Sequence, residues 1–259
     1  MASQLGRPRR RPTAMRLDRG LERERILEAA SRIGLPVEAK QVDQLQVYLD
    51  LLERWNRIYN LTAVRDREAM RVQHLFDCLA ALPPVQRRFG DPRPAAAGGP
   101  APVGTKRLTV VDIGSGGGLP GLVWSVLWPQ AQVHCVDPVG KKAAFVRQVA
   151  GELGLSLKAW HGRAETLAPL DGDIVTSRAF ASLADFTRLS DGHLAPGGCW
   201  VALKGRPPEG EYSALPSGVE VFHVEPLQVP ELQAERCLVW LRRHNQEAAK
   251  ASPNLPEAG

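Results

Sequence analysis

Hydrophobic residues recur at helical spacing in the first third of the chain. In residues 42–59 they stand three and four positions apart, which predicts an amphipathic helix with one buried face. We interpret its aromatic residues as core rather than as a platform for base stacking. A second periodic stretch follows Asp66, a candidate N-cap, and continues to Leu82. We expect that helix to end at Pro83-Pro84, because proline removes a backbone donor.

The rest of the chain alternates between short apolar runs and helical patterns. The continuous, β-branched runs indicate strands of a parallel sheet with both faces covered. These runs are residues 108–113, 131–136, 156–160, 173–176 and 199–203. Two later runs, 219–224 and 237–241, have no helical pattern between them and predict a closing antiparallel pair. The fold class is therefore α/β.

Composition divides the chain into five segments. One segment is rich in arginine and proline, as is typical of a disordered arm. Another is rich in proline, glycine and alanine, as is typical of a linker. The segments are a disordered arm (1–19), an N-terminal helical cap (20–84), a linker (85–107), the main domain (108–243) and a flexible tail (244–259).

Charge and cysteine usage narrow the function classes. The net charge of +5 is carried by residues 1–25, which hold eight arginines and three acids. Such an arm attracts phosphate backbones without reading sequence, although a solvated tail is the alternative. The four cysteines are 57, 64 and 38 residues apart, which fits neither a structural metal site nor a redox pair. With no apolar run of about 18 residues and no secretory signal, we expect a cytoplasmic protein.

A glycine-rich loop carries the first chemical signal. Gly114, Gly116 and Gly118 follow the strand 108–113, and Asp137 ends the next strand, where a carboxylate can accept the hydroxyls of a ribose. Leu119 stands where a dinucleotide fingerprint has glycine or alanine, which weakens a nicotinamide interpretation. With the turn Pro196-Gly197-Gly198, this set resembles the class I S-adenosylmethionine (SAM) methyltransferases. An α/β domain without a ligand is the other alternative.

The ends of later strands indicate the kind of acceptor. The chain has no Asn-Pro-Pro motif of amino-group methyltransferases, and Cys199 starts a strand, as expected of a buried thiol rather than a nucleophile. Arg178 and Lys204 each follow a strand, where they suit a phosphate or the O6 and N7 edge of guanine. For each of the two cations, the structural alternative is a salt bridge with a nearby acid such as Asp112 or Asp137.

Five motifs together resemble one family, the small-subunit rRNA guanine-N7 methyltransferases RsmG, also called GidB. They are Trp55-Asn56-Arg57-Ile58-Tyr59-Asn60-Leu61-Thr62-Ala63-Val64-Arg65-Asp66, His74-Leu75-Phe76-Asp77, the loop from Asp112 to Gly121, Ser177-Arg178-Ala179 and Ala202-Leu203-Lys204-Gly205. They occur in the family's order. Two departures are small: Cys78 replaces the usual serine, and Gly117 stands where many members have proline.

The resemblance implies a Rossmann-like class I methyltransferase fold, with a mostly parallel seven-stranded sheet and an antiparallel last strand. It implies methyl transfer from SAM to N7 of guanine 527 of 16S rRNA, in the 30S subunit or an assembly intermediate. The implied cofactor residues are Gly114, Gly116, Leu119, Asp137, Val139, Ala164, Glu165 and Arg178. Residues that position or bind the nucleotide would be Arg178, Lys204, His74, Asn60, Arg163 and Arg65.

Three alternatives stay open at this point. The first is a SAM-dependent methyltransferase for another RNA base or a protein, the second a non-catalytic RNA-binding factor, and the third a nicotinamide oxidoreductase. Nothing in the sequence indicates an obligate interface, so we expect a monomer. Guanine N7 carries a lone pair and no proton, so the absence of a catalytic dyad or triad is expected.

Overall fold

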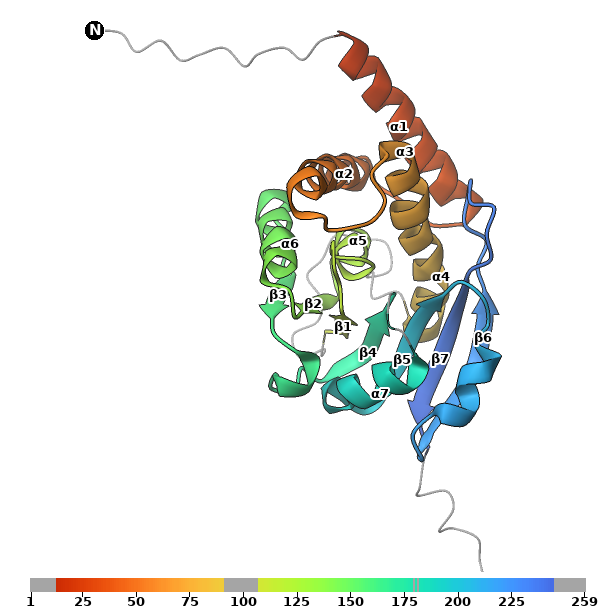
Figure 1. The fold of residues 1–259 in the computed structure, drawn as a ribbon. Helices are drawn as coiled ribbons and strands as arrows, with labels where there is room; N and C mark the ends of the chain where they lie inside the picture. Colours follow the sequence, from red (N-terminus) through yellow and green to blue (C-terminus); the bar gives the residue numbers. More distant parts are fainter. Residues whose placement is uncertain (1–12, 91–106, 179, 181, 245–259) are drawn as a thin grey trace, which may run out of the picture.

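The computed structural model describes residues 13–90, 107–178, 180 and 182–244 (Figure 1). Its N-terminal part is helical. The elements are α1 (Thr13–Arg32), α2 (Ala39–Tyr59), α3 (Arg67–Met70), the π-helical segment η1 (Arg71–Phe76) and α4 (Asp77–Phe89). The helix α1 begins within the arm predicted to be disordered, so that prediction is wrong for residues 13–19. Residues 1–12 of the arm lie outside the described residues.

The second part forms a seven-stranded sheet. The strands are β1 (Thr109–Ile113), β2 (Gln132–Asp137), β3 (Lys158–His161), β4 (Gly172–Ser177), β5 (Leu194–Lys204), β6 (Val219–Pro226) and β7 (Cys237–Arg243), in the order β3-β2-β1-β4-β5-β7-β6. The first five pair in parallel, and β7 lies antiparallel between β5 and β6. The predicted parallel sheet with an antiparallel last strand is confirmed.

Helices cover both faces of this sheet. They are α5 (Gly121–Leu127), α6 (Gly140–Leu153) and α7 (Leu183–Ser190), with short 3-10 turns at η2 (Ala164–Thr166), η3 (Asp191–His193) and η4 (Glu209–Ala214). One hydrophobic cluster joins α5 and α6 to the N-terminal helices, and a second lies under α7 on the opposite face.

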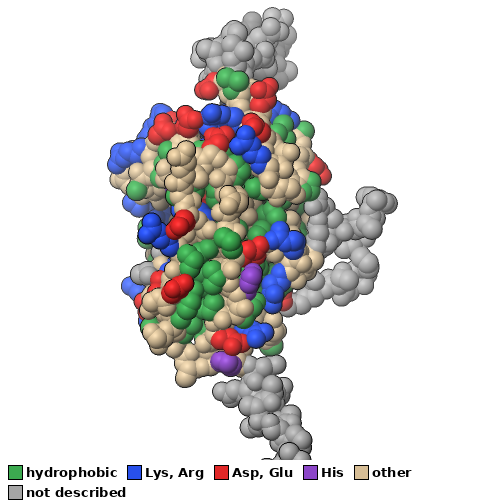
Figure 2. Space-filling view, turned by 90° about the vertical axis from the view of Figure 1, so that its right-hand side faces the viewer, with side chains coloured by type: hydrophobic (Ala, Val, Ile, Leu, Met, Phe, Trp, Pro, Cys, Tyr) green, Lys and Arg blue, Asp and Glu red, His purple; other side chains and the backbone are tan. Residues whose placement is uncertain are grey.

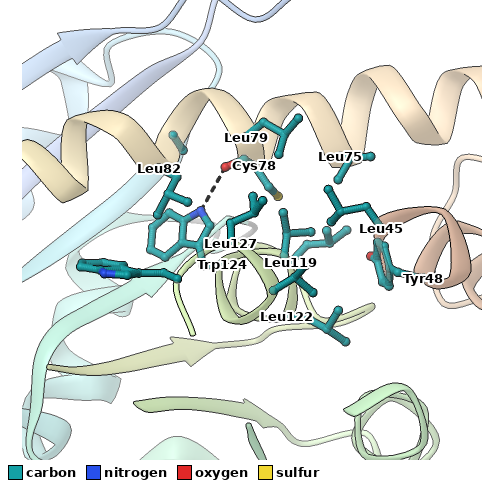
Figure 3. Packing of buried hydrophobic residues seen from close by; sticks show 14 of the residues in the cluster. Leu45, Tyr48, Leu75, Cys78, Leu79, Leu82, Leu119, Leu122, Trp124 and Leu127 are labelled. Carbon is teal, nitrogen blue, oxygen red and sulfur yellow. Dashed lines mark hydrogen bonds between the residues drawn. The ribbon is translucent and has the colours of Figure 1, made fainter. Parts of the chain in front are cut away.

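The N-terminal helices share the main core. Figure 3 shows leucines of η1 and α4 packed against the α5 region, where the indole nitrogen of Trp124 donates a hydrogen bond to the carbonyl of Cys78 (3.0 Å). Gln41 and Gln44 of α2 donate to the carbonyls of Val126 and Leu153, each at 2.9 Å. These bonds satisfy carbonyls at the C-terminal ends of α5 and α6, which those helices cannot pair themselves. The helical cap is therefore built onto the sheet domain by packing and by specific polar contacts.

The end of α4 differs from the prediction. The helix continues through Pro83-Pro84 to Phe89, so a helix end at the prolines is wrong. Burial supplies the reason, since Pro84 and Val85 are buried and packing there offsets the missing backbone donors. The rest of the predicted linker, residues 91–106, lies outside the described residues.

The strand β6 forms one edge of the sheet, on the side seen in Figure 2. Hydrophobic side chains gather on this face between charged residues and histidines. Phe222 lies within cation–π distance of Arg88 (4.5 Å) and Arg242 (5.1 Å). No helix in the described ranges is long and apolar enough to cross a membrane.

Candidate active site

The strand order brings the predicted site residues to one edge of the sheet. Because β1 lies between β2 and β4, and β5 follows β4, the carboxyl ends of these four strands are neighbours. Gly114, Asp137, Arg178 and Lys204 stand at these ends. Ligands of open α/β sheets bind at such an edge.

The glycine loop adopts a conformation that its sequence requires. Gly114, Gly116 and Gly118 have φ angles of 69°, 56° and 82°, in the left-handed region where a β-carbon is disfavoured. The amides of Gly114 and Ser115 donate to the carbonyl of Val136 at 2.8 and 3.1 Å, which ties the loop to β2. The helix α2 also supports it, because the fully buried hydroxyl of Tyr48 donates to the carbonyl of Gly117 (3.0 Å).

Asp137, the residue predicted to hold the ribose, fixes this loop. One of its carboxylate oxygens accepts the amide of Gly116 and the other the amide of Val139, both at 2.8 Å. A carboxylate has about four acceptor positions, so each oxygen retains one for a further donor. The geometry is compatible with a carboxylate that orders the loop and accepts ribose hydroxyls.

Asp112 is a buried acid for which the sequence assigned no role in the site. One of its oxygens accepts the amide of Gly121 (2.8 Å), and burial raises the pKa of the carboxyl to about 7. A β-carbon at Gly121 would lie 2.8 Å from the sulfur of Cys135 and 2.9 Å from Asp112, so only glycine fits there. This explains the glycine that ends the loop motif.

Arg178 joins the loop region to the N-terminal helices. Its guanidinium donates to the carbonyl of Gln73 and to Nδ1 of His74, both at 3.1 Å, and lies 3.6 Å from Asp77. The alternative partners considered from sequence, Asp112 and Asp137, are not those found, since the acid paired with Arg178 in the described residues is Asp77. The His-x-x-Asp motif thus holds Arg178 from two sides.

The protonation of His74 follows from its partners. Arginine can only donate, so Nδ1 accepts and the proton resides on Nε2, which lies 2.7 Å from the hydroxyl of Thr62. Burial, and then the charge of Arg178, lower the pKa of His74 to about 4. At neutral pH this imidazole is uncharged with both nitrogens engaged, as expected of a positioning residue.

The long Trp-Asn motif builds the loop that carries Thr62. The buried Asn56 accepts the amide of Thr62 (2.8 Å) and donates to the carbonyl of Val64 (2.9 Å). Asn60 ends α2 in the left-handed conformation and is exposed, with Arg65 donating to it at 3.3 Å. Asn60 and Arg65 therefore lie on the outer surface of this loop.

A pocket of about 390 Å³ opens beside Arg178. Its lining includes Gln73, His74, Asp77, Arg178, Leu203, Lys204, Gly205 and Arg236. Lys204 pairs with Glu211 (3.0 Å), and Arg236 pairs with Asp77 (3.0 Å). Three cationic groups thus surround the pocket, with two carboxylates holding them in place.

Arg236 was missed by sequence reasoning. It stands alone before the last strand, and no motif marks it. The antiparallel register pairs Lys204 with Cys237, which carries the neighbouring Arg236 to the pocket. The closing strand that follows Arg236 was predicted from the sequence. Placing Arg236 at the pocket also requires the register between β7 and β5, which the sequence does not reveal.

The residues after β3 form a separate part of the site. The amide of Gly162 donates to the carbonyl of Asp137 (3.1 Å), and the buried Ala164 accepts Nε2–H of His193 (2.8 Å). Arg163 and Glu165 are exposed and lie 3.9 Å apart. The structure places them on the β3 side, whereas Arg178, His74 and Lys204 share the pocket at β4 and β5.

Unsatisfied polar atoms test whether SAM fits this edge. Seven buried side-chain polar atoms of the described residues have no hydrogen-bond partner, and three of them, Asp112 Oδ1, Ser115 Oγ and Ser177 Oγ, lie in or directly after β1 or at the end of β4. Buried polar atoms normally have partners, so these three are available to a polar ligand. A β-carbon at Gly114 would lie 3.7 Å from the ring of Phe180, which gives the loop an apolar neighbour. A cofactor with both charged and apolar parts fits these residues.

Comparison with known proteins identifies the family of this chain. The family model GidB, described as rRNA small subunit methyltransferase G, matches residues 41–93 and 99–239. A protein of Acidovorax ebreus named ribosomal RNA small subunit methyltransferase G is 52% identical over 219 residues, which cover 84% of this chain and 93% of the relative. A protein of Methylibium petroleiphilum with the same name is 48% identical over 231 residues, which cover 89% of this chain and 96% of the relative. The chain therefore belongs to the GidB family of rRNA small subunit methyltransferases, which use S-adenosylmethionine as methyl donor.

Proposed function

We propose that this protein transfers the methyl group of SAM to N7 of a single guanine, position 527 of 16S rRNA. The observation that carries the proposal is the pocket that Arg178, Lys204 and Arg236 line at the ends of β4 and β5. Guanine offers O6 and N7 as acceptors, and arginine is the side chain best suited to that edge. A phosphate of the same nucleotide would be held by the remaining cations.

The chemistry requires alignment rather than a base. When bound, SAM supplies an electrophilic methyl group on its sulfonium. The N7 lone pair of guanine is available without deprotonation, so the residues of the pocket orient the base and exclude water. Orientation alone gives effective molarities of roughly 10⁵ M or more. His74, with a pKa of about 4 and both nitrogens in hydrogen bonds, contributes by holding Arg178.

The remaining roles follow the position of each residue. Asp137 would hold the ribose while ordering the loop, and Arg178 would lie between cofactor and base. The cofactor would be lined further by Gly114, Gly116, Leu119, Val139, Ala164 and Glu165. Lys204, Asn60, Arg65 and Arg163 would contact the RNA.

The charge distribution supports an assembled form of the substrate. Residues 26–259 have no net charge, so the domain itself does not attract bulk RNA strongly. We propose a monomer that acts in the cytoplasm on the 30S subunit or an assembly intermediate.

Transfer of label tests the reaction and the substrate form. The protein would be incubated with tritiated SAM and either 30S subunits or naked 16S rRNA from cells that lack it. We expect label in 16S rRNA, with 30S subunits preferred. Label in ribosomal protein would move the reaction to a protein acceptor, and SAM binding without transfer to either substrate would contradict the proposal.

A further inference from the structure

The C-terminal end of α2 carries an aromatic stack that reaches from the core to the surface. Phe145 of α6 is fully buried, the ring of Trp55 lies 5.5 Å from it, and the ring of Tyr59 lies 5.0 Å from Trp55. Tyr59 is 40% exposed and its neighbour Ile58 is 68% exposed. The interpretation of all these aromatic residues as core is therefore wrong for Tyr59. Its ring is held against the protein on one side and open to solvent on the other.

Exposed cations stand in the same segment of the sequence as this ring. Residues 54–65 contain three arginines and no acid, and all three arginines are exposed. Arg57 pairs with Glu53 on the previous turn, and Arg65 makes a weak bond to Asn60. The helices α2 and α6 contact each other in opposite chain directions, since Gln44 of α2 bonds to Leu153 at the end of α6 and Trp55 packs on Phe145. The exposed Lys141 stands four residues before Phe145 in α6. An exposed aromatic ring among cations is typical of surfaces that bind single-stranded nucleic acid.

The stack is linked to the pocket through the loop after α2. Tyr59 is three residues from Thr62, and three residues span at most about 11 Å. Thr62 contacts His74, which contacts Arg178 in the pocket wall. This relay of contacts connects the end of α2 to the pocket wall that would hold the guanine.

We propose that Tyr59, supported by Ile58, stacks against an unpaired base that flanks the target guanine, while Arg57 and Arg65 bind phosphates of the same strand. The proposal rests on the proposed function, because it requires RNA as the substrate. It adds that the target guanine belongs to a single-stranded segment, since a base within a duplex cannot present its face to a side chain. RNA is favoured over a protein partner because the segment offers an exposed aromatic ring together with three exposed arginines, of which Arg57 is paired with Glu53.

Substitutions at Tyr59 test the stacking. We expect Tyr59→Leu to raise the KM for the RNA substrate about tenfold, with kcat and the Kd for SAM within about twofold of wild type. Tyr59→Phe keeps the ring and should restore the wild-type KM. Leu21→Ala, at an apolar residue of α1 that is 63% exposed, is the control for losing exposed apolar surface. Melting temperatures of all variants separate binding effects from unfolding.

Salt dependence tests the phosphate contacts. Arg57→Ala should reduce the slope of log KM against log salt by about 1, because one phosphate contact is lost. Arg32→Ala is the matched control, since Arg32 likewise pairs with a glutamate on the previous turn, Glu28. An unchanged KM for Tyr59→Leu, or equal slopes for the two arginine variants, would overturn the proposal. If wild-type protein transfers no methyl to RNA, the proposed function fails instead.

Discussion

The hydroxyl of Tyr48 links the N-terminal helices to the glycine loop, and its removal gives a measurable prediction. Tyr48→Phe deletes the 3.0 Å hydrogen bond to the carbonyl of Gly117 and keeps the ring, which packs near Phe145 with ring centroids 6.4 Å apart. Tyr48 is fully buried, so the carbonyl loses its partner where water does not easily replace it. Such a loss costs about 1 to 2 kcal/mol.

This free energy is divided between folding and SAM binding. If the loop keeps its conformation without the bond, the whole cost lowers stability, by roughly 2 to 4 °C in melting temperature per kcal/mol for a chain of this size. If the loop relaxes in the free protein, binding must restore its conformation. We expect the variant to bind SAM with a free energy less favourable by about 1 kcal/mol, which raises the Kd for SAM about fivefold.

Calorimetric titration with SAM and thermal melting measure the two parts. Tyr212→Phe is the control, because it makes the same chemical change in η4, on a different part of the fold. A Kd for SAM that stays within about twofold of wild type, together with a lower melting temperature, would refute the inference that α2 positions the loop for its cofactor.

Three further changes test other parts of the account. Asn56→Ala removes two buried bonds to the loop after α2 and should lower the free energy of unfolding in urea by about 2 to 4 kcal/mol. Arg178→Ala should reduce methyl transfer by roughly 100-fold or more in a labelling assay while SAM still binds, because the base loses its main donor; near-normal turnover with unchanged melting would remove Arg178 from the mechanism. Burial raises the pKa of Asp112 from 3.8 to about 7. Between these two pH values the folded state therefore binds more protons than the unfolded state. The contribution of Asp112 to the free energy of unfolding consequently falls as the pH rises from about 4 to about 7. Asp112→Asn should weaken the pH dependence of the free energy of unfolding, measured by urea titration from pH 5 to 8. Identical pH profiles for the wild type and the variant would contradict the raised pKa of Asp112.

The sheet was predictable because each strand is a continuous apolar run between turn residues. The glycine loop was predictable for a similar local reason, since positive φ angles at Gly114, Gly116 and Gly118 require glycine. Asp137 follows from its place at the end of the next strand. These features depend on residues that are near one another in sequence.

The features that were missed depend on long-range packing. The helix α4 passes through Pro83-Pro84 because its apolar face is buried against the sheet domain, which no local pattern reveals. The partner of Arg178 was misassigned because Asp77 approaches from a helix 101 residues earlier in the chain, whereas Asp112 and Asp137 were the acids visible at the sheet edge. The exposure of Tyr59 likewise follows from where α2 ends relative to α6. The spacing of hydrophobic residues in α2 predicts which face of the helix is apolar, but it does not predict what that face contacts.

The identity of the methylated nucleoside decides whether this protein methylates N7 of guanine. Labelled 16S rRNA from the transfer reaction would be digested to nucleosides for mass spectrometry, and a second sample would be cleaved at 7-methylguanine and mapped by primer extension. The account predicts one methyl group per rRNA, present as 7-methylguanosine at position 527, and none with Arg178→Ala. Label in another nucleoside, or at several guanines, would contradict it.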